Sequence, residues 1–167
     1  MFARSMRAID RGVELTLFVI FLAFTLVGGL QIFNRFVLGL PLSWSEEFQK
    51  FGHIWMVFLA IPVAYRYGAH LGMDMILRAL PRGLRRTVEL AVEAMWLALA
   101  LAIGWYTQAI MVVARNQDSP GLGIRMDHVY LGLVIGAAYL GLVAFRRLLD
   151  FFGIIDEPRP TLLDSHS

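Results

Sequence analysis

The side chains that could do acid–base, nucleophilic or metal chemistry are few in this chain. It has no cysteine, which excludes disulfides, thiolate nucleophiles and metal clusters held by Cys. Haem ligation by two histidines needs both at matching depth in a helical bundle. The four histidines are scattered instead, toward one end of the apolar runs (His53, His128), toward the other (His70) and in the C-terminal tail (His166). No GxSxG, HExxH or Walker loop occurs, so we expect no enzymatic activity and no cofactor.

A group of charges opens the second apolar run. At 3.6 residues per turn, Glu46, Lys50 and His53 fall within about 60° of one another on one helical face. Glu46 precedes Lys50 by four residues, the favourable order for an ion pair, and Glu47 lies on another face. Charge near the hydrocarbon boundary is costly unless it is paired or turned into protein. Two interpretations stay open: an ion pair that ends the membrane span, or a buried contact with a partner subunit.

A second acidic pair precedes the third apolar run. Glu89 and Glu93 lie four residues apart on one face, one turn after Arg85 and Arg86. Glu93 lies deepest of the carboxylates, which raises the question of proton transfer. An arginine-paired acid at the membrane edge is the favoured interpretation.

Four apolar runs must position these side chains. Residues 15–34 and 94–114 carry no formal charge, a third run covers 128–145, and a shorter one covers 51–65. A helix of about 20 apolar residues crosses the hydrocarbon core and satisfies its own backbone there. The chain is 58% hydrophobic and 17% charged, with a mean hydropathy of +0.64. We therefore predict an all-α integral membrane protein, one domain over 1–167, with four transmembrane helices at approximately 13–34, 44–65, 88–114 and 128–149 and a flexible tail at 156–167.

Local patterns refine this prediction. Ser43 and Glu46 form a capping-box pattern after Pro41, so the second helix is expected to begin there. Pro62 should kink that helix without ending it. Gly132 and Gly136 form a small-xxx-small pair that would allow close helix packing.

The apolar positions of 71–84 recur at helical spacing, which predicts a short amphipathic interfacial helix whose flanking arginines meet lipid headgroups: Arg78, Arg82, Arg85 and Arg86.

Basic residues are distributed unevenly between the two sides. Eleven of the fifteen lie before the first run, between the second and third runs, or after the fourth. The other four lie in the two remaining loops. The positive-inside rule then places both termini and the middle loop in the cytoplasm. The first run is too long for the apolar core of a signal peptide and is followed by no small-residue cleavage site.

These features indicate a small membrane subunit that works with a larger partner. No span has a formal charge near its centre, and the inverted repeats of a self-sufficient transporter are absent from the sequence. Several segments together resemble the small membrane subunit of tripartite ATP-independent periplasmic (TRAP) transporters: NRF at 34–36, SWSEE at 43–47, WMVFLA at 55–60 and AYRYGAHLGMD at 64–74. The similarity covers roughly residues 10–150, and the second half, including SPGLGI at 119–124, matches more loosely.

The resemblance implies a function and partners. A large permease subunit would hold the substrate and sodium sites, and a periplasmic binding protein would deliver an organic acid. The small subunit, in the bacterial inner membrane, would brace the permease and help to dock the binding protein, with no nucleic-acid partner. A set of motif residues would be structural or at the subunit interface: Arg35, Trp44, Glu46, Glu47, Lys50, His53, Arg66, His70 and Asp74. The solvent-facing candidates for docking are Asp118, Arg125 and Asp127.

Two other classes of function stay open. A membrane anchor of a redox complex would show a Soret band, and the absent cysteines and mismatched histidines disfavour it. An autonomous small exporter would transport by itself in liposomes.

Overall fold

The structure is a computed structural model that describes residues 2–39, 42–67 and 80–154. Nearly all of this part is helical. Helix α1 (Phe2–Phe33) continues into a short π-helix, η1 (Asn34–Leu38), and the remaining helices are α2 (Ser43–Arg66), α4 (Arg82–Ala114) and α5 (Met126–Phe151). The tail predicted at 156–167 and most of the interfacial segment predicted at 71–84 lie outside the described residues.

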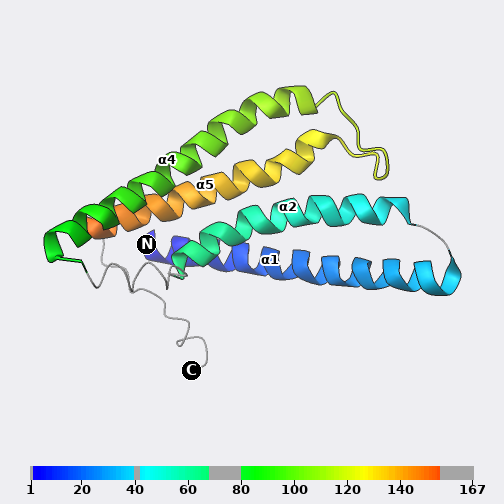
Figure 1. Cartoon of the computed structure of the whole chain (residues 1–167), viewed down its shortest axis with the longest axis horizontal. Helices are drawn as coiled ribbons and strands as arrows, with labels where there is room; N and C mark the ends of the chain where they lie inside the picture. The colour runs from blue at the N-terminus through cyan, green and yellow to red at the C-terminus, as the bar shows by residue number, and fades with distance from the viewer. Residues whose placement is uncertain (1, 40–41, 68–79, 155–167) are drawn as a thin grey trace.

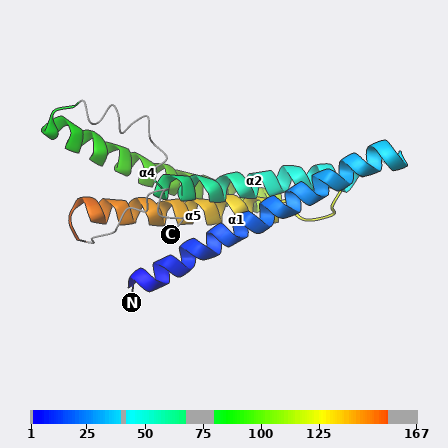
Figure 2. The ribbon, with the colours of Figure 1, turned by 90° about the horizontal axis from the view of Figure 1, so that it is seen from below.

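Helices α1 and α4 run in one direction and α2 and α5 in the other (Figure 1). The four lie in the order α4, α5, α2, α1, each packed on the next, so the central neighbours α5 and α2 are parallel. Seen from below, α1 crosses the other helices obliquely (Figure 2). The start of α1, the end of α2, the start of α4 and the end of α5 lie at one end of the molecule, which we call the terminal end. The η1 turn and the α4–α5 loop lie at the opposite end, which we call the hairpin end.

The lengths of the helices fit a membrane. Helices α1, α4 and α5 are long and apolar enough to cross one. Helix α2 has 24 residues and is about 36 Å long at 1.5 Å per residue, but charged residues in its first turns lower its hydropathy. It lies between α1 and α5 and packs against both. The chain is therefore an all-α membrane protein of four long helices.

Helix α5 is the centre of the packing, because it contacts both α2 and α4. Four of its buried residues form one hydrophobic cluster with a residue from each neighbour: Tyr139, Leu140, Val143 and Ala144 of α5, Tyr65 of α2 and Ala100 of α4. Helix α1, by contrast, has no buried residue in its most apolar stretch. Its apolar side chains face outward, as expected for a helix that borders lipid or another subunit.

Two glycines of α5 allow α2 to approach closely. A Cβ added at Gly132 would lie 2.8 Å from the ring of Trp55. A Cβ added at Gly136 would lie 2.5 Å from the carbonyl oxygen of Phe58. Real Cβ atoms do not come this close, so the predicted small-xxx-small contact is confirmed, and its partner is α2.

The start of α2 differs from the sequence prediction. Ser43 is already the first helical residue, and the capping position falls on Leu42, which makes no side-chain cap. The predicted capping box is therefore wrong, because the hydroxyl of Ser43 stands one residue too late. The Ser45 hydroxyl donates instead to the Leu42 carbonyl, at 2.7 Å. Pro62 lies buried inside α2, and the helix continues past it to Arg66.

Two helices begin earlier than the apolar runs indicated. Helix α1 starts at Phe2 and not near 13, and α4 starts at Arg82 and not near 88. Pro81 precedes α4 with an extended backbone, as suits a residue just before a helix. An apolar run marks only the part of a helix that lies in the hydrocarbon core, and charged turns can extend the helix beyond that core.

Candidate functional site

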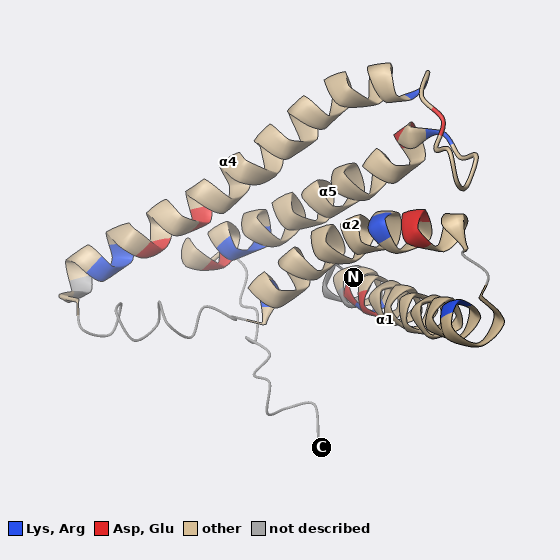
Figure 3. Cartoon of the chain, turned by 45° about the vertical axis from the view of Figure 1, so that its right-hand side comes forward, with Lys and Arg blue, Asp and Glu red and all other residues tan. Residues whose placement is uncertain are grey.

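Charged side chains gather near the two ends of the helices (Figure 3). The apolar runs between these ends contain no Asp, Glu, Lys or Arg in the sequence. Two polar networks result, one at each end. The terminal-end network comprises Asp10, Glu14, Tyr65, Arg66, Tyr67, Glu93, Tyr139, Arg146 and Arg147, and the hairpin-end network comprises Glu47, Asp127, His128 and the loop at 115–125.

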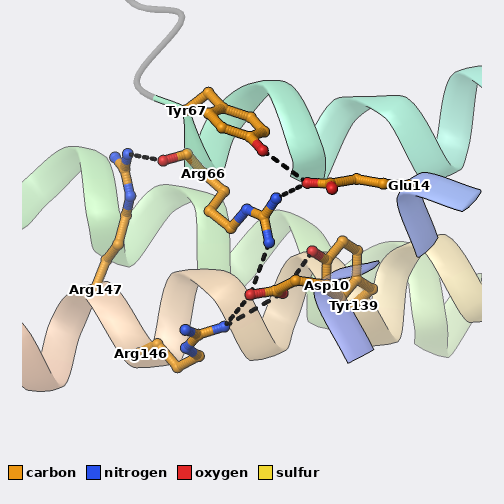
Figure 4. A network of polar contacts seen from close by, with 7 residues as sticks. All are labelled: Asp10, Glu14, Arg66, Tyr67, Tyr139, Arg146 and Arg147. Carbon is orange, nitrogen blue, oxygen red and sulfur yellow. Dashed lines mark hydrogen bonds and ion pairs between the residues drawn. The ribbon is translucent and has the colours of Figure 1, made fainter. Parts of the chain in front are cut away.

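Asp10 is the centre of the terminal-end network (Figure 4). It is 6% exposed and lies on α1. Its carboxylate is 2.7 Å from Nη1 of Arg66 at the end of α2 and 3.4 Å from Nη1 of Arg146 on α5. The hydroxyl of Tyr139 donates to it at 2.8 Å. One buried carboxylate thus joins three helices.

Glu14 adds a second carboxylate one turn later on α1 (Figure 4). It pairs with Nη2 of Arg66 and accepts a hydrogen bond from the Tyr67 hydroxyl at 2.8 Å. That hydrogen bond raises the pKa of Tyr67. Arg66 therefore bridges Asp10 and Glu14, which share a face because four residues separate them.

Glu93 of α4 forms the other half of this network. Arg147 Nη1 lies 3.4 Å from its carboxylate, and the Tyr65 hydroxyl donates to it. Arg147 also donates to the carbonyl oxygen of Tyr65, at 2.6 Å. The arginine-paired acid is confirmed, although its partner comes from α5. Arg85, expected nearby, pairs with Glu89 at 2.7 Å.

This arrangement balances charge and joins every helix. Asp10 and Glu14 face Arg66 and Arg146, and Glu93 faces Arg147, so the three acids match the three arginines. Losing one member of a buried pair is strongly destabilising, because the other charge stays buried. The network is suited to holding α1, α2, α4 and α5 in one arrangement.

At the hairpin end, Glu47 binds the loop between α4 and α5. Its Oε2 accepts hydrogen bonds from the backbone N–H groups of Gly121, at 2.9 Å, and Leu122, at 3.0 Å. The Ser119 hydroxyl donates to the same oxygen. Three donors around one carboxylate oxygen form a small anion-binding nest, occupied by the chain's own side chain.

Asp127, at the start of α5, is the second acid of the hairpin end. Its side chain is 8% exposed, and its Oδ2 lies 3.1 Å from Nη2 of Arg125 and 3.8 Å from Nε of Arg115. Nδ1 of His128 lies 3.0 Å from its Oδ1. Asp127 was expected to face solvent, and that expectation is wrong, because it is turned inward as the counter-charge of two exposed arginines. Asp118 and Arg125 are exposed, as expected.

Three charged residues predicted to be structural or at the subunit interface, Arg35, Glu46 and Lys50, form no ion pair with one another in the structure. All three are exposed, and within the described residues none of them has an ion-pair partner. Trp44 packs edge-on against Phe48.

Of the other predicted positions, some lie within the described residues and others outside them. The ring centroid of His53 lies 6.3 Å from that of Phe24, and the guanidinium of Arg86 lies 5.4 Å from the Phe151 centroid. Arg82 begins α4. His70, Asp74 and Arg78 lie outside the described residues. Within the described ranges, no group of three or more His, Cys, Asp or Glu residues could hold a metal ion.

Sequence reasoning missed the centre of the terminal-end network. Asp10 and Glu14 were not singled out, and Arg146 and Arg147 were used only to assign membrane orientation. A signal was available, since two acids four residues apart immediately before an apolar run need partners at the membrane edge. The sequence contained no indication of which arginines would serve.

The fold and these networks define a class: a multi-pass helical membrane protein whose charges support its structure. The family model described as "Tripartite ATP-independent periplasmic transporters, DctQ component" matches residues 24–153. The chain belongs to this family, that of the small TRAP permease subunits.

Relatives agree with this assignment. The chain is 27% identical over 154 residues to a Haemophilus influenzae protein described as a TRAP transporter small permease, covering 90% of this chain and 92% of the relative. It is 25% identical over 113 residues to the C4-dicarboxylate TRAP transporter small permease protein DctQ of Pseudomonas aeruginosa, covering 65% and 53%. It is also 31% identical over 112 residues to the isethionate TRAP transporter permease protein DctMQ of Oleidesulfovibrio alaskensis, covering 66% of this chain and 17% of that longer protein.

Proposed function

We propose that this chain braces the large permease subunit of a TRAP transporter and helps to dock the periplasmic binding protein. The observation that carries the proposal is the placement of charge. The middles of the apolar runs hold none, and the buried acids at the ends pair with arginines of the same chain. A translocation path needs polar groups near the membrane midplane, so this chain is better suited to bracing than to carrying solute.

The longer relative DctMQ supports a large membrane partner. This chain matches only 17% of that protein, so most of the relative lies outside the matched part. We infer that the partner of this chain is a separate large permease subunit that holds the substrate and sodium sites. The outward apolar side chains of α1 and α4 offer it surface.

Topology completes the proposal. The basic residues favour a cytoplasmic terminal end in the bacterial inner membrane, which leaves the hairpin end in the periplasm. Among the described residues, a binding protein could then reach the η1 region, the start of α2 and the α4–α5 loop. The relatives named for C4-dicarboxylate, isethionate and ectoine support a small organic acid as the substrate class.

Copurification and uptake test the proposal. An affinity tag on this chain should retain a large permease subunit from the native membrane. Proteoliposomes that hold the large subunit alone should lose most of the uptake that depends on the binding protein. A Soret band in the purified chain would instead favour a redox anchor. Transport by the chain alone would favour an exporter.

A further inference from the structure

We propose that Glu47 is a latch that holds the α4–α5 hairpin in its docking shape, and that the latched hairpin presents exposed arginine side chains to an acidic surface of the binding protein. The inference rests on the proposed docking role and goes beyond it by naming a positioning residue and the chemistry of the surface that is recognised.

The hairpin has an ordered backbone. Ser119 N–H donates to the Ile124 carbonyl and Gly123 N–H to the Ser119 carbonyl, both at 2.9 Å. Met126 N–H closes the base onto the Gln117 carbonyl, also at 2.9 Å. Gly123 has a φ of +66°, in the left-handed region that favours glycine. A preformed loop loses little conformational entropy when a partner binds.

Glu47 connects this hairpin to α2. Without the carboxylate, the N–H groups of Gly121 and Leu122 and the Ser119 hydroxyl would lose a shared acceptor. The fit is close from the loop side as well, because a Cβ added at Gly121 would lie 2.9 Å from the Glu47 carboxyl carbon. Glu46, the preceding residue, is exposed and makes no hydrogen bond with the described residues. The two neighbours have the same chemistry, yet only Glu47 contacts the hairpin.

Folding also decides which charged side chains are exposed at the hairpin end. By sequence this end is neutral, with four basic residues (Arg35, Lys50, Arg115, Arg125) and four acids (Glu46, Glu47, Asp118, Asp127). Glu47 is engaged by the loop, and Asp127 is buried. All four basic residues stay exposed, against two acids. The net charge stays neutral, because buried Asp127 lies beside Arg115 and Arg125, but the charged side chains that a partner can contact are mainly basic.

The arginines nearest the hairpin frame an apolar tip. The side chains of Arg115 and Arg125 are 65% and 55% exposed, and they flank a loop on which Pro120 and Ile124 are also exposed. An apolar centre with a charged rim is the usual composition of a protein interface. A shaped and rigid hairpin fits recognition of a folded protein better than attraction to lipid headgroups, which needs charge alone.

The test measures binding of the cognate binding protein to nanodiscs that hold both membrane subunits. Glu47→Ala should raise the dissociation constant about tenfold, whereas Glu46→Ala should change it less than about twofold, because only the first removes a structural contact. Acetate at high concentration should restore binding to Glu47→Ala by occupying the nest, and it should leave Glu46→Ala unchanged. Gly121→Ala, which displaces the carboxylate from the loop side, should resemble Glu47→Ala.

Charge variants test the second half of the inference. Arg115→Glu and Arg125→Glu should each weaken binding about three- to tenfold and flatten its salt dependence, while Asp118→Lys should strengthen it. Hydrogen exchange at Gly121 and Leu122 should accelerate in Glu47→Ala and not in Glu46→Ala, a readout that does not need the binding protein.

The outcomes separate the two proposals. If nanodiscs that hold the large subunit alone bind the binding protein as tightly as nanodiscs that hold both subunits, the docking role fails. If binding needs this chain yet Glu47→Ala matches Glu46→Ala, the latch is refuted and the docking role stands. If both arginine reversals leave binding unchanged or strengthen it, the acidic partner surface is refuted.

Discussion

Removing the Asp10 carboxylate should destabilise the whole helical assembly. Asp10 contacts Arg66 at 2.7 Å, Arg146 at 3.4 Å and the Tyr139 hydroxyl at 2.8 Å, and the side chains of Asp10 and Arg146 are 9% and 8% exposed. Arg66 keeps Glu14 as a partner, whereas Arg146 loses this carboxylate. Breaking a buried ion pair from one side costs about 3–5 kcal/mol. At about 2–4 °C per kcal/mol for a chain of this size, Asp10→Leu should lower the unfolding midpoint in detergent by roughly 6 °C or more.

A double variant distinguishes charge from packing. Asp10→Leu combined with Arg146→Leu removes both charges and leaves the Arg66–Glu14 pair in place, and apolar replacement of a buried pair is often neutral. The double variant should therefore lose about 2 kcal/mol less than the sum of the two single losses, as expected for residues in contact. Glu46→Gln, at an exposed position, is the control and should change stability by less than about 0.5 kcal/mol. An unchanged midpoint for Asp10→Leu, or purely additive losses in the double variant, would refute the reasoning.

Three further predictions concern packing, protonation and topology. Gly136→Ala should lower stability by about 1–3 kcal/mol, because its Cβ meets the α2 backbone. Gly104→Ala, where the added Cβ meets nothing within 4 Å, is the control and should be neutral in the same thermal melt. Equal effects of the two variants would contradict the close approach. Glu93→Gln should lower stability yet retain substrate uptake per assembled complex, since its carboxylate serves an ion pair; loss of uptake with normal assembly would restore a role in proton transfer. An impermeant maleimide should label the exposed Gln117→Cys on intact cells but label Ser165→Cys only after lysis, and the reverse pattern would invert the proposed topology.

Much of the architecture was predictable from the sequence. Uncharged runs of about 20 residues, such as 15–34 and 94–114, indicate helices in hydrocarbon, because a helix satisfies its backbone within one segment of that length. The Gly132/Gly136 spacing predicted a close helix contact, and Glu93 was expected to pair with an arginine. The SWSEE motif at 43–47 indicated the family. These features depend on local periodicity and composition, which a sequence displays directly.

Only the tertiary structure decided which charges meet. The predicted first helix began after Asp10, and the arginines that pair with Asp10 and Glu14 come from α2 and α5. Asp10 also accepts a hydrogen bond from Tyr139, 129 residues away in the sequence. Glu46 and Glu47 are adjacent and chemically alike, yet the rotation of α2 turns one toward the hairpin and the other to solvent. Asp127 was expected at the surface, but in the folded chain it is buried at the start of α5 as a counter-charge. The sequence determined where charge is allowed, at the helix ends, because lipid excludes it from the middle. The packing of the helices determined its partners, since partners depend on which faces the helices turn toward one another.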